Sequence, residues 1–201
     1  MEDTYKTIEN PSEGLFKDKG SRFIAKAFPV ESVEEVKEIL SSLRKEYHDA
    51  RHHCYAYRIG PGGANYRVND DGEPANSAGK PILGQMQSQD LTNILIVVIR
   101  YFGGILLGVG GLINAYRSAA KESIEHSSIV IKTFNCQIRI RFQYPSMNDV
   151  MRTIKDNKAE IIKQEFGIGC EILIQIRTGS ADGMIHQLQR IDLVESQINA
   201  W

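Results

Sequence analysis

The segment Ile94–Ile113 reads ILIVVIRYFGGILLGVGGLI, and its interpretation decides that of the whole chain. Its length approaches the about 20 apolar residues that a membrane-spanning helix needs. Arg100, however, would cost about 2.5–3.5 kcal/mol at the centre of a bilayer, and the glycines would weaken a helix. The short, β-branched first part instead predicts a buried strand that leads into a glycine-rich turn. We therefore expect no membrane span.

The sequence around this segment predicts a first domain over residues 1–132. Apolar residues on both sides of Lys17–Gly20 predict a hairpin, and Ser32–Glu35 forms a capping box that predicts the start of a helix. The other predicted elements are a strand over His53–Ile59, a short helix over Gly79–Gln87 after Ser77, and a helix that contains Leu112 and runs to about His126.

A second domain is predicted over residues 133–201. The hydrophobic pattern gives strand, helix, strand, strand, helix and strand, the order of a split βαβ or ferredoxin-like arrangement. Its two central strands, 159–166 and 170–177, are joined tightly at Gly167 and Gly169. The fold class expected for the chain is therefore α+β with two domains.

The amino-acid composition excludes several classes of protein. The 201 residues carry 24 Lys plus Arg and 25 Asp plus Glu, a formal net charge of -1, which excludes a bulk polycation and an acidic tail. Three cysteines at no close spacing indicate unpaired thiols in a reducing compartment. The first ten residues lack the apolar region of a secretory signal, so we expect a cytoplasmic protein.

An acidic loop, residues 69–79, holds the first group of candidate site residues. Clustered carboxylates suit a hard cation, but the calcium-loop pattern would need acids where Arg67 and Ala78 stand. A turn around Asp71–Gly72 is the favoured alternative, and we predict no metal and no cofactor. The candidate residues of this loop are Asp70, Asp71, Gly72, Glu73, Pro74, Ser77 and Gly79.

The glycine run between the predicted strand and helix allows two interpretations. Its backbone N–H groups and the helix dipole could hold a phosphate, or its glycines could permit tight turns and close packing. It matches neither the dinucleotide fingerprint nor the nucleotide-binding loop, and both interpretations stay open. The glycines concerned are Gly103, Gly104, Gly108, Gly110 and Gly111.

Two further patterns have an ordinary structural explanation. Cys54 beside His52 and His53 could be a nucleophile with a base, but a buried structural cysteine is favoured. Tyr55 and Tyr57 share a strand face as in a base-stacking platform, but core packing is favoured.

Basic residues gather in two stretches that contain no acid, 50–69 and 91–121. If the two stretches meet, they form a positive surface beside the glycine turn that suits a phosphate backbone. The alternative is a set of ordinary exposed arginines that acids from other segments balance. The candidate residues for nucleic-acid or phosphate binding are Arg51, Arg58, Arg100 and Arg117.

Three blocks of sequence, in this order, resemble the YigZ/Impact family. They are Asp49–Arg58 (DARHHCYAYR), Asn69–Pro74 (NDDGEP) with Ser77–Leu83 (SAGKPIL), and Arg100–Leu112 (RYFGGILLGVGGL). The likeness covers about Gly14 to Val130. It implies an N-terminal domain of the left-handed βαβ type found in ribosomal-protein and GHMP-kinase-like folds, and a C-terminal domain similar to the last domain of elongation factor G.

The resemblance also implies a function, because eukaryotic relatives act in translational control by competing for an activator of a stress kinase. We therefore expect a non-enzymatic, translation-associated regulator that binds RNA, the ribosome or a translation-factor protein, and no membrane. Two alternatives remain: an enzyme that holds a phosphorylated ligand with the glycine turn and a divalent ion with the acidic loop, and a protein-binding adaptor. The sequence predicts no oligomeric state.

Overall fold

The computed structural model describes residues 3–199, which form two compact units. Within the described residues, the N-terminal unit is Tyr5–Lys132, and the C-terminal unit consists of residues 133–199 together with residues 3–4. Asp3 belongs with the C-terminal unit because its carboxylate accepts two hydrogen bonds from Arg177, at 2.8 and 3.1 Å, and its carbonyl accepts one from the backbone N–H of Phe134. The expected first domain therefore begins a few residues later than residue 1.

The N-terminal unit contains a five-stranded antiparallel sheet with three helices. The strand order is β2-β3-β6-β4-β5, so that β3 and β4 run parallel on either side of β6 and are connected through α1. The elements are β2 (Ser12–Asp18), β3 (Ser21–Pro29), α1 (Val33–Glu46), β4 (His52–Ile59), a 3-10 turn (Pro61–Gly63), β5 (Asn65–Asn69), α2 (Gly79–Ser88), β6 (Ile94–Tyr101) and α3 (Gly108–Glu125).

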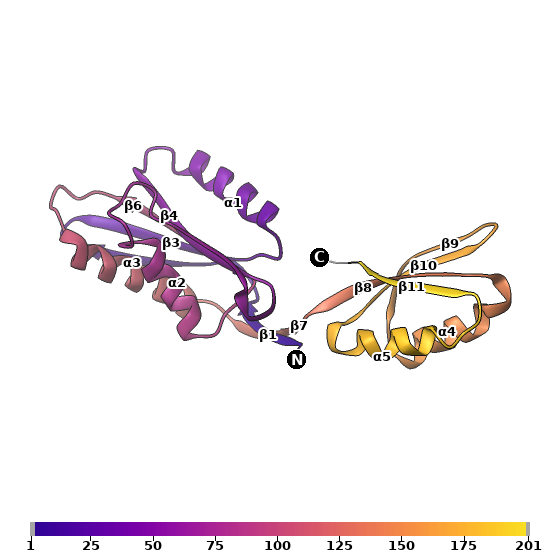
Figure 1. Ribbon diagram of the computed structural model, residues 1–201. Coiled ribbons are helices and arrows are strands. Elements are labelled where there is room, and N and C mark those ends of the chain that lie inside the picture. The colour runs from indigo at the N-terminus through magenta and orange to yellow at the C-terminus, as the bar shows by residue number, and fades with distance from the viewer. Residues whose placement is uncertain (1–2, 200–201) are drawn as a thin grey trace. The chain divides into compact units, whose positions relative to one another are not determined.

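The helices cover both faces of this sheet (Figure 1), which explains why β6 is apolar at every position up to Ile99. Ile96 and Val98 pack in the cluster that includes residues of α2 and α3, while Leu95 and Val97 pack in the cluster that includes residues of α1. A strand buried on both faces has a continuous hydrophobic run rather than an alternating one.

Local signals in the sequence set several of these elements. The predicted hairpin pairs Phe16 with Phe23, and Ser32 caps α1 by accepting a hydrogen bond from the N–H of Glu35 at 3.2 Å. Helix α3 begins at Gly108, four residues before Leu112. Three of the five glycines of the run, at 108, 110 and 111, therefore lie in the first turn of a helix and not in the turn before it.

The structure adds a two-stranded sheet that the sequence pattern did not predict. Strand β1 (Thr4–Ile8) pairs with β7 (Ile129–Thr133), which follows α3. Isolated two-stranded pairings have weak sequence signals because few of their residues are buried; only Thr7 and Ile8 of β1 are buried, and no residue of β7 is.

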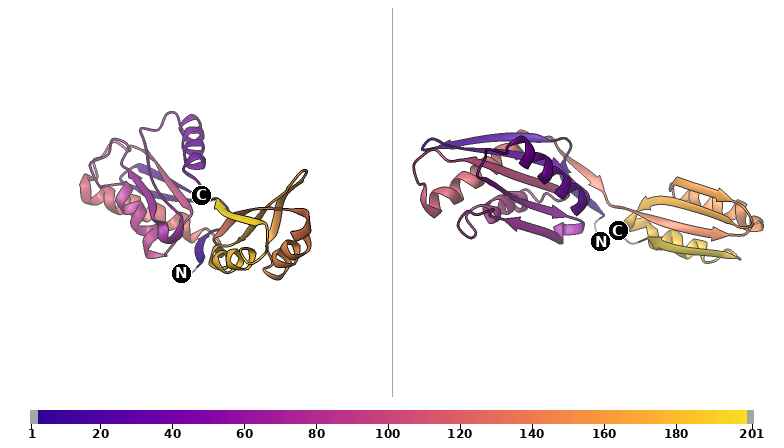
Figure 2. Two further views of the ribbon diagram at one scale, coloured as in Figure 1. Left: turned by 45° about the vertical axis from the view of Figure 1, so that its right-hand side comes forward. Right: turned by 90° about the horizontal axis from the view of Figure 1, so that it is seen from above.

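The C-terminal unit has the predicted split βαβ arrangement, with strand order β11-β8-β10-β9. Helices α4 and α5 lie on one face of its sheet (Figure 2), against a core that includes Ile138, Ile140, Ile172 and Ile174. The elements are β8 (Asn135–Phe142), a 3-10 turn (Tyr144–Ser146), α4 (Met147–Asp156), β9 (Glu160–Phe166), β10 (Cys170–Arg177), α5 (Thr178–Leu188) and β11 (Val194–Asn199).

Among the residues that the structure describes, no helix combines the length and the apolar character needed to cross a bilayer. The segment Ile94–Ile113 is a strand, a loop and the start of a helix.

Candidate functional site

Four segments meet at one end of the five-stranded sheet, which we call the loop end. They are the β2–β3 turn at Lys19–Gly20, the start of β4 with Arg51, the acidic loop of residues 70–78, and the glycine loop of residues 102–107 that follows β6. The register places them together: Arg22 pairs with Tyr101, and Arg100 pairs with both Phe23 and His52. Most of the candidate residues lie in or beside these segments.

A buried ion pair between Glu73 and Arg100 ties the acidic loop to β6. Glu73 Oε1 accepts hydrogen bonds from Arg100 Nη1 at 2.6 Å and from the hydroxyl of Tyr116, on α3, at 2.8 Å. The Glu73 and Arg100 side chains are 4% and 7% exposed. His52 Nε2 lies 4.0 Å from the same carboxylate oxygen. The expectation that Arg100 contributes to a free positive surface is therefore wrong, because an internal carboxylate neutralises it.

Asp70 is a structural acceptor at the start of α2. Its Oδ1 accepts hydrogen bonds from the backbone N–H groups of Ala78 at 3.0 Å and Gly79 at 2.8 Å, and its Oδ2 accepts one from Asn76 at 2.8 Å. A carboxylate at a helix N-terminus satisfies otherwise unpaired donors and interacts favourably with the helix dipole. Ser77 does not cap this helix, because its hydroxyl donates to the carbonyl of Pro74 at 2.6 Å.

Asp71 and Gly72 form the turn of the acidic loop. Asp71 Oδ2 accepts from the N–H of His53 at 2.7 Å, Oδ1 accepts from Arg44 at 3.2 Å, and its carbonyl lies 2.8 Å from His52 Nδ1. Asp71 and Gly72 both have positive φ, 42° and 86°. Glycine adopts such a conformation without steric cost, which is why a tight turn favours glycine at this position. The favoured turn interpretation describes this segment.

The acidic loop therefore directs its carboxylates into the protein. Within residues 3–199, no group of three or more His, Cys, Asp or Glu side chains has an arrangement that could hold a metal ion. Gly79 allows this compact arrangement, since a Cβ there would lie 2.8 Å from the backbone nitrogen of Asn69.

Cys54 and Tyr116 extend the network below Glu73. Cys54 Sγ lies 3.0 Å from the carbonyl oxygen of Asp70 and 3.3 Å from the Tyr116 hydroxyl, so its single proton can be donated to either oxygen. Burial raises the pKa of the Cys54 thiol and of the Tyr116 hydroxyl far above their ordinary values. A thiol that stays protonated is a poor nucleophile, which agrees with a structural cysteine.

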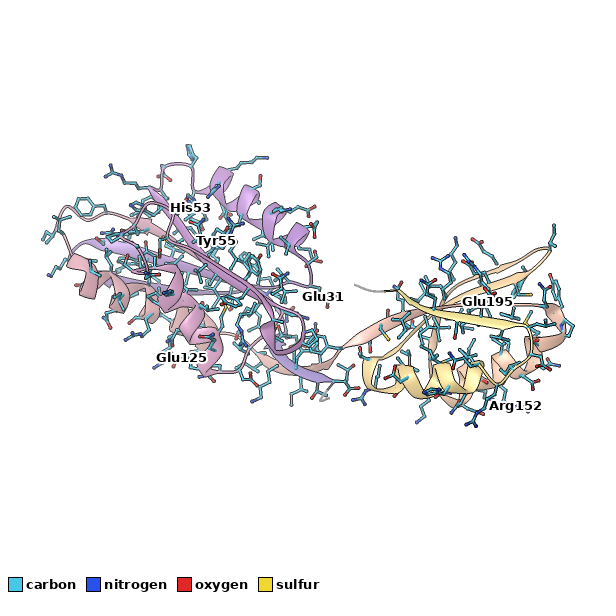
Figure 3. All side chains as sticks on the ribbon, in the orientation of Figure 1. Glu31, His53, Tyr55, Glu125, Arg152 and Glu195 are labelled. Atoms are coloured by element: carbon cyan, nitrogen blue, oxygen red, sulfur yellow. The ribbon has the colours of Figure 1, made fainter. Side chains whose placement is uncertain are left out.

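The opposite face of β4 belongs to the core beneath α1. Tyr55 and Tyr57 are buried there, and His53 and Tyr55 point toward α1 (Figure 3). Burial lowers the pKa of His53. The two tyrosines therefore form no base-stacking surface.

The structure does not bring the four candidate arginines together. Arg58 lies six residues from His52 along β4, about 20 Å away at the rise of a strand, and is buried at the other end of the sheet. Its guanidinium donates to the carbonyls of Leu91 at 2.6 Å and Gly62 at 2.8 Å. The expected contribution of Arg58 to a positive surface is wrong, because these carbonyls fix it inside the fold.

Arg51 and Arg117 remain exposed and, within residues 3–199, form no ion pair. Arg51 directly precedes β4 at the loop end, and Arg117 lies on the outer face of α3, about two turns from Gly110. Lys19, in the β2–β3 turn of the loop end, is also exposed and forms no ion pair within the described part of the chain. The sequence pattern identified Lys19 only as a turn residue, because its position depends on the contact between Gly20 and Gly103.

The glycine loop is held at its start and exposed at its tip. A Cβ on Gly103 would lie 2.0 Å from the carbonyl carbon of Gly20, and the N–H of Gly103 donates to Ser21 Oγ at 3.1 Å. Gly104 and Gly108 have positive φ, 88° and 69°, and open space around them. The exposed apolar side chains of the loop and the first turn of α3 are Phe102, Ile105, Leu106 and Val109.

Comparison with known proteins agrees with this architecture. The Impact N-terminal domain family matches residues 19–124. An IMPACT family member of Haemophilus influenzae is 31% identical over 85% of this chain and 84% of its own length, and IMPACT family member YigZ of Escherichia coli is 35% identical over 74% of each chain. A crystal structure described as that of a hypothetical protein, 28% identical, superposes with a TM-score of 0.76 and covers 100% of this chain and 98% of its own. The chain therefore belongs to the Impact family.

Proposed function

We propose that this protein is a non-enzymatic, translation-associated regulator of the cytoplasm that binds RNA, free or in the ribosome, through the loop end of its N-terminal unit. Two considerations support the proposal. The loop end offers basic groups that no acid neutralises, and the family likeness described above implies a role in translational control.

The observation that carries the proposal is the distribution of charge at the loop end. The acids Asp70, Asp71 and Glu73 are used as internal acceptors, while Lys19 and Arg51 are exposed and unpaired within the described residues. Arg117 adds a third such group on the adjacent helix α3. A protein of net charge -1 can therefore present a local positive surface, and phosphate contacts are the main source of affinity in RNA binding.

The proposal is tested by replacing the three cations together. The full chain and the variant Lys19→Gln/Arg51→Gln/Arg117→Gln are compared for binding to fluorescein-labelled single-stranded RNA by fluorescence anisotropy over a series of salt concentrations. Loss of three phosphate contacts should weaken binding and reduce the slope of log K against log salt by about 2. Co-sedimentation with purified ribosomes should weaken in parallel.

A matched variant controls for net charge. Lys132→Gln/Lys155→Gln/Lys158→Gln removes the same charge from exposed positions on β7, on α4 and just after α4, and its binding should equal that of the wild type. An equal loss of RNA affinity in both variants would mean that binding depends only on the net charge of the protein and not on the cations of the loop end. Absence of binding by the wild type to RNA and to ribosomes at moderate salt would refute the proposal.

A second candidate function, a protein-binding adaptor, is favoured by one observation. Three apolar side chains of the glycine loop and the first turn of α3 are exposed: Ile105 by 57%, Leu106 by 82% and Val109 by 52%. Clustered exposed apolar side chains often mark protein interfaces. The variant Ile105→Ser/Leu106→Ser separates the two functions. If the protein is an adaptor, this variant should no longer capture those protein partners whose binding to the wild type survives nuclease treatment, whereas its affinity for RNA should change little.

The arrangement gives no comparable support to the enzymatic alternative. That interpretation needs carboxylates free to hold a divalent ion, yet Asp70, Asp71 and Glu73 all accept hydrogen bonds from within the fold. A thermal-shift screen with nucleotides and magnesium would revive it if any phosphate ligand stabilised the protein.

A further inference from the structure

We propose that Phe102 is a preorganised stacking platform for an unpaired base, so that the RNA bound at the loop end is single-stranded. This inference rests on the proposed function and deepens it, because it assigns the class of RNA and the residue that selects it.

The side of Phe102 that faces the protein is fixed by Arg100. The Arg100 guanidinium carbon lies 5.6 Å from the centre of the Phe102 ring and 5.4 Å from that of Phe23, which is fully buried. Arg100 is itself held by Glu73 at 2.6 Å. One face of the Phe102 ring therefore packs against a rigid cation, within the range of a cation–π contact.

The residue that follows Phe102 is equally constrained. Gly103 approaches Gly20 so closely that any side chain would clash, and its N–H donates to Ser21 Oγ. Phe102 therefore lies between two constrained residues, Arg100 and Gly103, although Phe102 itself is outside regular secondary structure. Phe102 is nevertheless 46% exposed, and with Arg100 over one face of its ring, the opposite face is the part that solvent or a ligand can reach.

A fixed, half-exposed aromatic ring beside free cations matches the requirements of single-strand binding. Bases stack on aromatic side chains while basic groups contact the backbone, and a ring that already packs on one face loses less conformational entropy on binding than a free ring. Lys19 and Phe102 directly precede the touching glycines Gly20 and Gly103, so an exposed cation and the ring belong to the same part of the loop end. Duplex RNA keeps its bases stacked inside the helix and offers no base face to the ring.

The test compares Phe102→Leu with Phe102→Trp in the full chain. The probes are a fluorescein-labelled oligouridine and a duplex RNA of the same length, read by anisotropy. Phe102→Leu should weaken oligouridine binding about tenfold, since one base–aromatic stack contributes that order of affinity. It should leave duplex binding and the salt slope unchanged, because no charge is removed, whereas Phe102→Trp should keep wild-type affinity.

The matched control is Phe166→Leu. Phe166 is 48% exposed, at the end of β9 in the C-terminal unit, and its replacement should leave both affinities unchanged. Circular dichroism and thermal unfolding check that each variant is folded. A second readout is an oligoribonucleotide that carries 2-aminopurine, whose emission should change on binding the wild type and much less on binding Phe102→Leu.

The outcomes separate this inference from the proposed function. If the triple cation variant weakens oligouridine binding but Phe102→Leu behaves like Phe166→Leu, the RNA-binding function stands and the stacking platform is refuted. Equal loss of duplex and single-strand binding in Phe102→Leu also refutes it. If the wild type binds neither RNA, the stacking platform is refuted, and the RNA-binding function is refuted as well if the wild type also fails to co-sediment with ribosomes. If Phe102→Leu abolishes only nuclease-resistant capture of a protein, Phe102 belongs to a protein interface instead.

Discussion

Removal of one partner of the buried Glu73–Arg100 pair should strongly destabilise the N-terminal unit. The two charges are 2.6 Å apart and almost inaccessible to water. At an effective dielectric constant of about 20, their attraction is about 6 kcal/mol, and desolvation of the two groups offsets most of it. Arg100→Met takes away the attraction but leaves the Glu73 carboxylate buried, where it still accepts a hydrogen bond from the Tyr116 hydroxyl at 2.8 Å.

We expect Arg100→Met to lower the free energy of unfolding by about 3–5 kcal/mol, the usual cost of an unpaired buried charge. The double variant Glu73→Leu/Arg100→Met removes both charges and should recover most of this loss. Glu73→Gln should cost less than Arg100→Met, because the amide oxygen can still accept from both Arg100 and Tyr116.

The assay is urea unfolding of the full chain followed by circular dichroism, with separate transitions fitted for the two units. Glu171→Gln identifies the transition of the C-terminal unit, since Glu171 pairs there with Arg139 and Arg141 near the surface. A loss below about 1 kcal/mol for Arg100→Met, the range of exposed ion pairs, or a double variant no more stable than the single one, would refute the reasoning.

Three further predictions concern the backbone and pH. Gly103→Ala should destabilise by about 2 kcal/mol or more because its Cβ would overlap the backbone of Gly20, whereas Gly110→Ala, with open space on α3, should stabilise by about 0.5–1 kcal/mol in the same unfolding assay. Asp70→Ala should cost about 1–2 kcal/mol through loss of the α2 cap, and faster hydrogen exchange at the start of α2 would locate the effect. Burial lowers the pKa of His53 below 6.5, so the unfolded chain takes up its proton at a higher pH than the folded chain; stability should therefore fall as pH falls below about 6.5, and His53→Gln should flatten that dependence.

The elements that the sequence predicted are those with strong local signals. The helix start at Ser32, the alternation along β4 and the Lys17–Gly20 turn each depend on neighbouring residues, and all three are confirmed, although Glu35 accepts from the N–H of Glu31 instead of closing a capping box with Ser32. The order of elements in the C-terminal unit follows from the hydrophobic period in the same way. Helix α3 begins earlier than predicted, at Gly108, despite the low helix propensity of glycine.

The residues that the structure buries, although the sequence predicted them to be exposed, have hydrogen-bond partners that are distant in the sequence. Arg58 is paired with the carbonyl of Leu91, 33 residues away, and Arg100 with Glu73, 27 residues away. Both arginines lie in strands where an acid-free neighbourhood suggested exposure. No local pattern marks such a pair, since only the register of β4 and β6 and the path of the acidic loop bring the partners together.

The acidic loop and the acid-free stretches are parts of one charge arrangement. A carboxylate that accepts backbone or guanidinium hydrogen bonds inside the protein contributes little to the field outside it, and Asp70, Asp71 and Glu73 are all used in this way. The loop therefore neutralises buried donors, including Arg100, without cancelling the exposed cations Lys19 and Arg51. The buried pair has a second consequence, because the Arg100 that Glu73 holds is the group that fixes Phe102 at the surface. Removal of the acceptor at Glu73 should therefore weaken base stacking at Phe102 even though Glu73 itself contacts no ligand, and the 2-aminopurine readout with Glu73→Leu, which cannot accept from Arg100, would detect this coupling.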